Sequence, residues 1–178
     1  IYTTGNTLSL HDALPISTGS RPIQVPGFEF ADDPVWSSRD ALAAEEAPDS
    51  LVVVGAGYIG MELSTVFAKL GVDVTVVEML DGVLPGYEDD VARVVKKRAE
   101  ELGIEFNFGE AASGWEETEN GIVVTTEDED GEESTYDAEK VLVAVGRQPV
   151  SDSLDPEEAG VEVTENGFIE TDQQARTN

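Results

Sequence analysis

A Gly-x-Gly-x-x-Gly turn between an apolar run and an amphipathic segment is the feature that most constrains the fold of this chain. Residues 51–54 are LVVV, a run typical of a parallel strand that is covered on both faces. Gly55, Gly57 and Gly60 follow, and after a helical segment a second apolar run ends at Glu78. The order strand, glycine turn, helix, strand and carboxylate predicts a βαβ unit that binds a dinucleotide.

Each glycine of the turn has its own physical role in this interpretation. Gly55 permits the tight turn, and Gly60 lets the helix lie close to the sheet. Gly57 has no Cβ, so a pyrophosphate can approach the backbone N–H groups and the positive end of the helix dipole. Glu78, 18 residues beyond Gly60, is placed to accept hydrogen bonds from an adenosine ribose. A nucleotide-like ligand such as S-adenosylmethionine, or a purely structural βαβ unit, remains an alternative.

The rest of the chain predicts a mixed α/β domain. The first helix carries an apolar stripe of Ile59, Leu63, Val66, Phe67 and Leu70 and ends at Gly71. A second helix begins at the acidic residues 88–90 and has a stripe of Val91, Val94, Val95, Ala99 and Leu102. A third parallel strand is expected at 104–108, an antiparallel meander at 112–117, 121–126 and 132–136, and a return strand at 141–145. Residues 34–47 are expected to be a linker with a short helix at 40–44.

Composition narrows the possible functions. The chain has 178 residues, no cysteine, and 38 acidic against 10 basic residues, giving a net charge of −28. We therefore expect a halophilic protein in a cytoplasmic setting, with neither a disulfide nor a thiol nucleophile. Nucleic acids and anionic membranes are disfavoured as partners, and no apolar run approaches the ~20 residues of a membrane span.

Residues 1–17 differ in composition from the remainder. They contain one acidic residue, Asp12, and the only histidine of the chain, His11. The stretch TLSLHDALPI resembles the conceptual translation of a sequencing adapter, so we expect residues 1–17 to be foreign to the fold. We do not expect His11 and Asp12 to act as an acid/base pair.

Five separated motifs occur in order along residues 18–178: TGSRP, GAGYIGxE, the strand-end acid, VAVGRQP and GFIETDxxxRTN. In this order the chain resembles the pyridine nucleotide-disulfide oxidoreductases, flavoproteins with two dinucleotide sites. Within that family, residues 78–106 are most similar to the dihydrolipoyl dehydrogenases, and the acidity is typical of haloarchaeal ones. The resemblance implies a Rossmann-like NAD-binding domain over 48–149, between partial FAD-domain segments at 18–47 and 150–178.

The resemblance also implies roles for particular residues. The NAD pyrophosphate would be held by Gly55, Gly57, Tyr58, Ile59 and Gly60, and the adenosine ribose by Glu78. The adenine would lie near Ala112, the nicotinamide half near Val145, Gly146 and Arg147, the nicotinamide–flavin junction near Glu62, and FAD near Thr18, Gly19 and Ser20. For some of these residues a structural role is an open alternative: strand packing for Ala112, backbone and core contacts for Tyr58 and Ile59, and an ion pair for Arg147.

The activity implied by the family is hydride exchange between NAD and FAD, coupled to a cysteine pair that oxidises dihydrolipoamide. Such enzymes are homodimers and join 2-oxo acid dehydrogenase complexes through lipoyl domains. The family's flavin-binding GxGxxG, cysteine pair, Gly-Asp and His-Glu motifs do not occur in this sequence. We therefore expect an interior fragment without catalytic or metal-ligating residues. Mercuric reductase, glutathione-type reductase, NADH oxidase and a stand-alone NAD-binding module are the alternatives.

The charge predicts that folding depends on salt. Lowering the ionic strength lengthens the range of repulsion among the acidic side chains, from a Debye length of ~3 Å at 1 M to ~10 Å at 0.1 M, while apolar burial changes little. We expect the melting temperature, followed by circular dichroism, to fall markedly on dialysis from molar to millimolar KCl. An unchanged melting temperature would contradict the halophilic interpretation.

Overall fold

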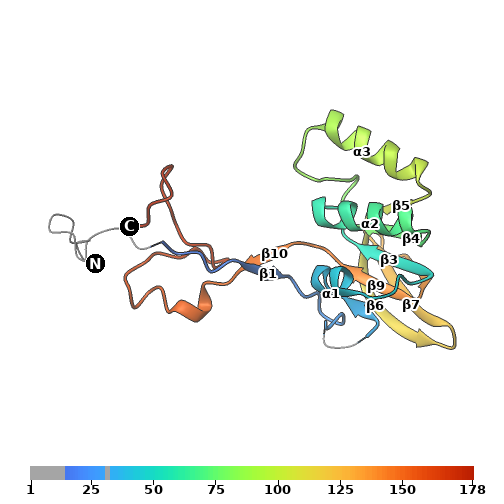
Figure 1. Cartoon of the computed structure of the whole chain (residues 1–178), viewed down its shortest axis with the longest axis horizontal. Helices are drawn as coiled ribbons and strands as arrows, with labels where there is room; N and C mark the ends of the chain where they lie inside the picture. The colour runs from blue at the N-terminus through green and yellow to red at the C-terminus, as the bar shows by residue number, and fades with distance from the viewer. Residues whose placement is uncertain (1–14, 31–32) are drawn as a thin grey trace, which may run out of the picture. The chain divides into compact units, whose positions relative to one another are not determined.

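The computed structural model describes residues 15–30 and 33–178, which divide into two compact units (Figure 1). The larger unit comprises Pro22–Arg147. The smaller unit comprises the described residues before Pro22 together with Gln148–Asn178. Most of the segment expected to be foreign, residues 1–14, lies outside the described residues.

A five-stranded sheet of parallel strands is the centre of the larger unit (Figure 1). Its order is β2 (Val35–Trp36), β9 (Lys140–Val143), β3 (Ser50–Val54), β4 (Asp73–Glu78) and β5 (Glu105–Phe108). In β3, Val54 is the register partner of Val143 on one side and of Val77 on the other. The predicted parallel strands are therefore confirmed, and the strand predicted at 141–145 does return to this sheet beside β3.

Three helices accompany the sheet: α1 (Ser38–Ala43), α2 (Tyr58–Leu70) and α3 (Asp89–Glu101). A capping box begins α1, because the Ser37 hydroxyl accepts from Arg39 N while Asp40 accepts from Ser37 N. Gly71 ends α2 in the left-handed conformation, at φ 93°, as the sequence predicts. The first turn of α3 carries two acidic residues, which favour the positive end of its dipole.

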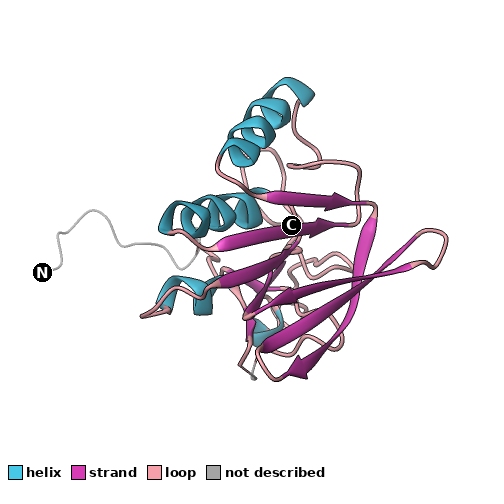
Figure 2. Ribbon diagram, turned by 90° about the vertical axis from the view of Figure 1, so that its right-hand side faces the viewer, coloured by secondary structure: helices cyan, strands magenta, loops and turns pink. Residues whose placement is uncertain are grey.

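The antiparallel meander forms a separate three-stranded sheet of β6 (Glu110–Thr118), β7 (Gly121–Asp128) and β8 (Glu133–Ala138). The central strand is β7, in which Val124 pairs with Trp115 on one side and Tyr136 on the other. Figure 2 shows the long meander strands beside the parallel sheet. The predicted meander is confirmed, with strands longer than the alternating pattern indicates.

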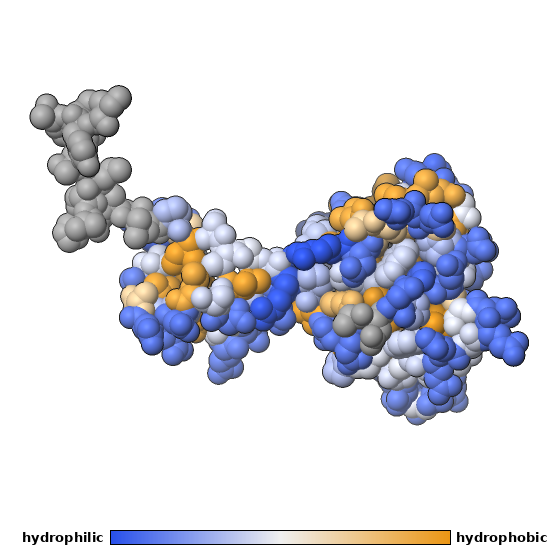
Figure 3. Space-filling model, turned by 60° about the horizontal axis from the view of Figure 1, so that its bottom comes forward, coloured by the Kyte–Doolittle hydropathy of each residue, from blue (hydrophilic) through white to orange (hydrophobic). Residues whose placement is uncertain are grey.

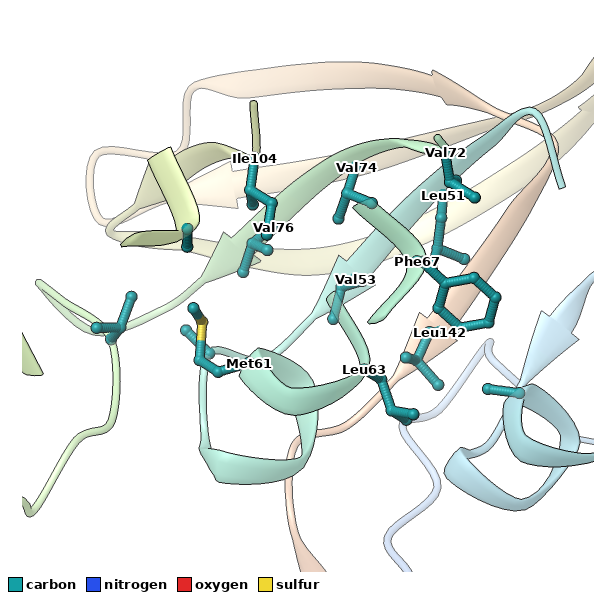
Figure 4. Close-up of a cluster of buried hydrophobic side chains, with 14 of the residues drawn as sticks. Leu51, Val53, Met61, Leu63, Phe67, Val72, Val74, Val76, Ile104 and Leu142 are labelled. Carbon is teal, nitrogen blue, oxygen red and sulfur yellow. The ribbon is translucent and has the colours of Figure 1, made fainter. Parts of the chain in front are cut away.

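Side chains that alternate along the parallel strands build two hydrophobic cores. Leu51 and Val53 of β3 pack in a cluster with residues of the helices, and Figure 4 shows them beside Met61 and Phe67 of α2. The intervening Val52 and Val54 belong to a second cluster, which includes Ile122 and Val124 of the meander. The sheet is thus covered on both faces, and each fully buried Val or Leu contributes about 1.5–3 kcal/mol relative to exposure.

Parts of the predicted apolar stripes are wrong. Four of the residues assigned to them are between 50% and 69% exposed: Val66, Leu70, Val91 and Val94. The inner face of α2 instead includes Gly60, Met61 and Ser64. A Cβ on Gly60 would overlap the carbonyl oxygen of Gly55, so the turn sets the rotation of the helix and overrides the apolar periodicity. In α3, the core contacts come from Ala92, Val95 and Ala99.

The segment expected to be a linker, 34–47, contains structure that the sequence did not predict. Val35 and Trp36 form β2, which pairs with β9 as an edge strand of the parallel sheet. Val35 is buried and Trp36 packs 6.1 Å from the Phe67 ring, centroid to centroid. The predicted short helix is confirmed as α1. A two-residue strand is too short for periodicity to reveal it.

The smaller unit has little regular structure. Strands β1 (Ser20–Pro22) and β10 (Arg147–Pro149) pair in a two-stranded sheet at its junction with the larger unit, and a short helix covers Asp152–Leu154. Arg21 forms an ion pair with Asp152 at 3.0 Å. In the view of Figure 3, much of the protein surface is hydrophilic, with smaller apolar patches. No helix in the described part of the chain is long and apolar enough to cross a membrane.

Candidate dinucleotide-binding site

A cleft of about 570 Å³ opens where β9, β3 and β4 end, within the larger unit. In an open parallel sheet, ligands bind outside the carboxyl ends of the strands, where the connections leave a crevice. The cleft is lined by Val25, Val54, Gly55, Gly57, Tyr58, Ile59, Val77, Glu78, Met79, Leu80, Pro85, Glu110, Ala111, Ala112, Ala144, Val145, Gly146 and Arg147.

The glycine turn is packed tightly on one side and open on the other. Gly55 adopts φ +104°, and a Cβ there would lie 2.8 Å from the carbonyl oxygen of Ala144. A Cβ on Gly60 would overlap Gly55, whereas a Cβ on Gly57 would meet no protein atom within 4 Å. Gly55 and Gly60 are therefore required for packing, while Gly57 leaves free space over the first turn of α2.

The N-terminus of α2 presents hydrogen-bond donors beside this free space. Gly57 is the N-cap residue and has no side chain to satisfy the first backbone donors. The first helical hydrogen bond runs from Met61 N to Gly57 O, at 2.9 Å. The N–H groups of Tyr58, Ile59 and Gly60 precede it and have no partner within the helix. Together with the helix dipole, they suit a pyrophosphate.

Glu78 is buried at the end of β4, with 7% of its surface exposed. Its Oε2 accepts a hydrogen bond from Ala56 N at 2.7 Å, and its Oε1 accepts one from Leu80 N at 2.9 Å. The carboxylate therefore joins the glycine turn to the loop after β4. Each oxygen retains a lone pair, so Glu78 can also accept from a hydroxyl group in the cleft.

Glu110 is a second carboxylate in the cleft, which the sequence analysis missed. Its Oε2 accepts hydrogen bonds from Thr126 Oγ1 at 2.5 Å and from the Tyr136 hydroxyl at 2.7 Å. Thr126 is fully buried. Burial, followed by the hydrogen bond to Glu110 and its negative charge, raises the pKa of Tyr136 to about 12.

The structure brings most of the predicted NAD-site residues together. The cleft is lined by Gly55, Gly57, Tyr58, Ile59, Glu78, Ala112, Val145, Gly146 and Arg147. Gly60 does not line the cleft but packs against the carbonyl group of Gly55 in the turn. Glu62 is exposed on α2 and does not line the cleft either. Thr18, Gly19 and Ser20 belong to the other unit, where Gly19 O accepts from Val150 N.

Other lining residues were not predicted, and their positions show why. Met79, Leu80 and Pro85 lie in the loop after β4, and Glu110 and Ala111 follow β5. Residues just beyond the carboxyl end of a parallel strand are the signal that could have identified them. Among residues 15–30 and 33–178, no group of three or more His, Cys, Asp or Glu side chains could hold a metal ion.

The parallel sheet, the glycine turn at α2 and the cleft at the strand ends define a Rossmann-like α/β protein. The family profile described as pyridine nucleotide-disulphide oxidoreductase matches residues 3–178. The chain belongs to this family.

Individual relatives agree with this assignment. A dihydrolipoyl dehydrogenase of Haloferax volcanii is 68% identical over 163 residues, which cover 92% of this chain and 34% of that protein. The crystal structure of LpdA from Mycobacterium tuberculosis is similar with a TM-score of 0.78 and 29% identity, covering 90% of this chain and 34% of that chain. A water-forming NADH oxidase from Lactobacillus brevis, bound to NADH, has a TM-score of 0.74 and 25% identity over 90% of this chain and 36% of its own. The chain spans about a third of the length of these proteins.

The burial of Tyr136, together with its contact with Glu110, predicts a shifted titration. The pKa of Tyr136 is raised from 10.0 to about 12 in the folded state, so its contribution to stability is fully present below pH 10 and is lost as the pH rises towards 12. Ultraviolet difference titration, with Tyr136→Phe subtracted to isolate this tyrosine, measures the pKa. Glu110→Gln should lower it towards 10, because the negative charge is removed. An ordinary titration of Tyr136 in the unsubstituted chain would refute the contact.

Proposed function

We propose that this chain is the NAD-binding part of an FAD-dependent dihydrolipoyl dehydrogenase. The observation that carries the proposal is the open position at Gly57, beside unpaired helix N–H groups and within the same cleft as the buried carboxylate of Glu78. The 68% identity to the Haloferax volcanii enzyme supports this activity rather than that of another flavoprotein disulfide reductase. NADH bound to the Lactobacillus brevis relative supports the ligand.

The residues of the cleft fit a dinucleotide. The pyrophosphate would lie over Gly57 and accept hydrogen bonds from the first turn of α2. Glu78 would accept hydrogen bonds from the hydroxyl groups of the adenosine ribose. Because β9 and β4 flank β3 on opposite sides, the residues after β9, Val145, Gly146 and Arg147, would line the nicotinamide half.

The bound dinucleotide supplies hydride chemistry, and the residues of this chain supply binding and orientation. Gly146 adopts φ +141°, and a Cβ there would lie 3.3 Å from Ile23 Cδ1. A residue with a side chain would thus be strained at position 146. Because glycine has none, the backbone itself lines the cleft there. Thr18, Gly19 and Ser20 are proposed to contact FAD, and Glu62 the nicotinamide–flavin junction, as the family resemblance implies.

The parent enzyme is proposed to be a cytoplasmic homodimer that joins 2-oxo acid dehydrogenase complexes through lipoyl domains. This proposal rests on the family and on the name of the haloarchaeal relative. The domain boundaries at 48–149, the flanking FAD-domain segments and the foreign origin of residues 1–17 are likewise proposals.

We predict that the chain binds NADH more tightly than NADPH. A 2′-phosphate would approach the carboxylate of Glu78, and no Lys or Arg occurs from residue 77 to residue 92 to offset the repulsion. Two unit charges at ~4 Å interact by ~4 kcal/mol at an effective dielectric of ~20, before solvent relaxation. Isothermal titration calorimetry in molar KCl should show at least a ~10-fold preference for NADH, and equal affinities would contradict the role of Glu78.

A matched pair of glycine variants tests the cleft in the same experiment. Gly57→Ala places a methyl group over the first turn of α2 without a protein clash, so it should abolish NADH binding and leave the melting temperature nearly unchanged. Gly114→Ala is the control, because a Cβ there also meets no protein atom within 4 Å and Gly114 does not line the cleft. Equal NADH binding by both variants would exclude a pyrophosphate at Gly57.

The purified chain alone should show no NADH-dependent reduction of lipoamide. Disulfide exchange requires a thiolate, and this sequence contains no cysteine. We also expect colourless protein that retains no FAD. Absorbance of NADH is followed with lipoamide present, and a full-length haloarchaeal dihydrolipoyl dehydrogenase serves as positive control. Turnover above the rate without protein, or a flavin absorbance band, would refute this prediction.

A further inference from the structure

The cleft contains two carboxylates at the ends of neighbouring strands. Glu78 ends β4 and is the register partner of Phe108, which ends β5. Gly109 then turns the chain with φ +78°, and Glu110 begins β6. Glu110 therefore lies one strand further from the glycine turn than Glu78, and both line the same cleft.

Hydroxyl groups of two other strands fix the direction of the Glu110 carboxylate. Thr126 of β7 and Tyr136 of β8 both donate to Oε2. None of the residues in the described ranges donates a hydrogen bond to Oε1. The carboxylate is thus held by one oxygen, and the other oxygen is left as an acceptor on a residue that lines the cleft.

The order of the strands shows which part of a dinucleotide would lie beside Glu110. The pyrophosphate belongs over the turn after β3, and the adenosine ribose at Glu78 after β4. The sheet continues from β4 to β5, so the base lies beyond the ribose, towards Glu110, Ala111 and Ala112. The base thereby meets an ionisable acceptor and two small apolar side chains.

We infer that Glu110 is a specificity-determining residue, whose Oε1 accepts a hydrogen bond from the 6-amino group of adenine. This inference rests on the proposed function, because it places the adenosine half of NAD in the cleft. A base with a 6-oxo group presents an acceptor to the carboxylate and is disfavoured. Thr126 and Tyr136 prevent the carboxylate from turning away, so the mismatch cannot be relieved by a side-chain rotation.

The test compares NADH with its deaminated analogue, reduced nicotinamide hypoxanthine dinucleotide, by isothermal titration calorimetry in molar KCl. The unsubstituted chain should bind NADH about tenfold more tightly than the analogue, since a hydrogen bond to a charged group is lost. Glu110→Gln can either donate or accept and should bring the two affinities to within about twofold. Glu116→Gln, an exposed position on the same strand outside the cleft, should keep the tenfold preference.

The outcomes separate this inference from the function on which it rests. Equal binding of both dinucleotides by the unsubstituted chain would overturn the role of Glu110, and so would an unchanged preference in Glu110→Gln. In either case, binding of NADH by the unsubstituted chain would still support the proposed function. Failure of the unsubstituted chain to bind either dinucleotide would overturn both. If Glu110→Gln does not fold, Tyr136→Phe is tested instead, because it keeps the carboxylate and removes one of its two donors. A smaller preference for NADH over the analogue then supports the inference, and an unchanged preference overturns it.

Discussion

The close approach of Gly60 to the carbonyl group of Gly55 determines how α2 lies against the parallel sheet. Only a residue without Cβ permits this approach, and it fixes both the distance and the rotation of the helix. The rotation brings Met61 and Phe67 into the core with Leu51 and Val53, and it aims the first turn of α2 at the cleft. The packing of α2 and the proposed dinucleotide binding therefore both depend on one backbone contact. The residue that leaves space for the ligand, Gly57, is a different glycine.

The extent to which the sequence predicted the structure varies with the range of the interactions involved. Strands β3 and β4 were predicted because most of their residues are apolar and buried. The hairpins of the meander were predicted because Asn120-Gly121 and Asp130-Gly131 are sequences that favour tight turns between strands. The exposure of Val66 and Leu70 was not predicted, since a contact with the turn, rather than apolar periodicity, orients α2. Glu110 was missed because its partners, Thr126 and Tyr136, are 16 and 26 residues away along the chain.

The acidic surface has few compensating contacts. Three ion pairs of the described residues lie within α3 and join exposed side chains three or four positions apart, as Arg93 with Asp90 and Arg98 with Glu101. Pairs of this kind contribute about 0.3–0.5 kcal/mol each. Lys140 is an exception, because its side chain is 19% exposed and its ammonium group lies 2.8 Å from Asp33 and 5.9 Å from the Trp36 ring centroid. The remaining acids must be accommodated by solvent and its ions.

Ala56 connects the glycine turn to the loop after β4 through two hydrogen bonds, and these limit which residues can replace Glu78. Its N–H group donates to Glu78, and its carbonyl group accepts from Leu84 N at 2.8 Å. Ala56 is fully buried, so replacing Glu78 with an apolar residue would leave a buried donor unsatisfied, at a cost of about 1–3 kcal/mol. A variant that lost Glu78 in order to accommodate a 2′-phosphate would therefore need another acceptor for the Ala56 N–H group. If Glu78 selects the cofactor as proposed, that selection is coupled in this chain to the hydrogen bonding of the glycine turn.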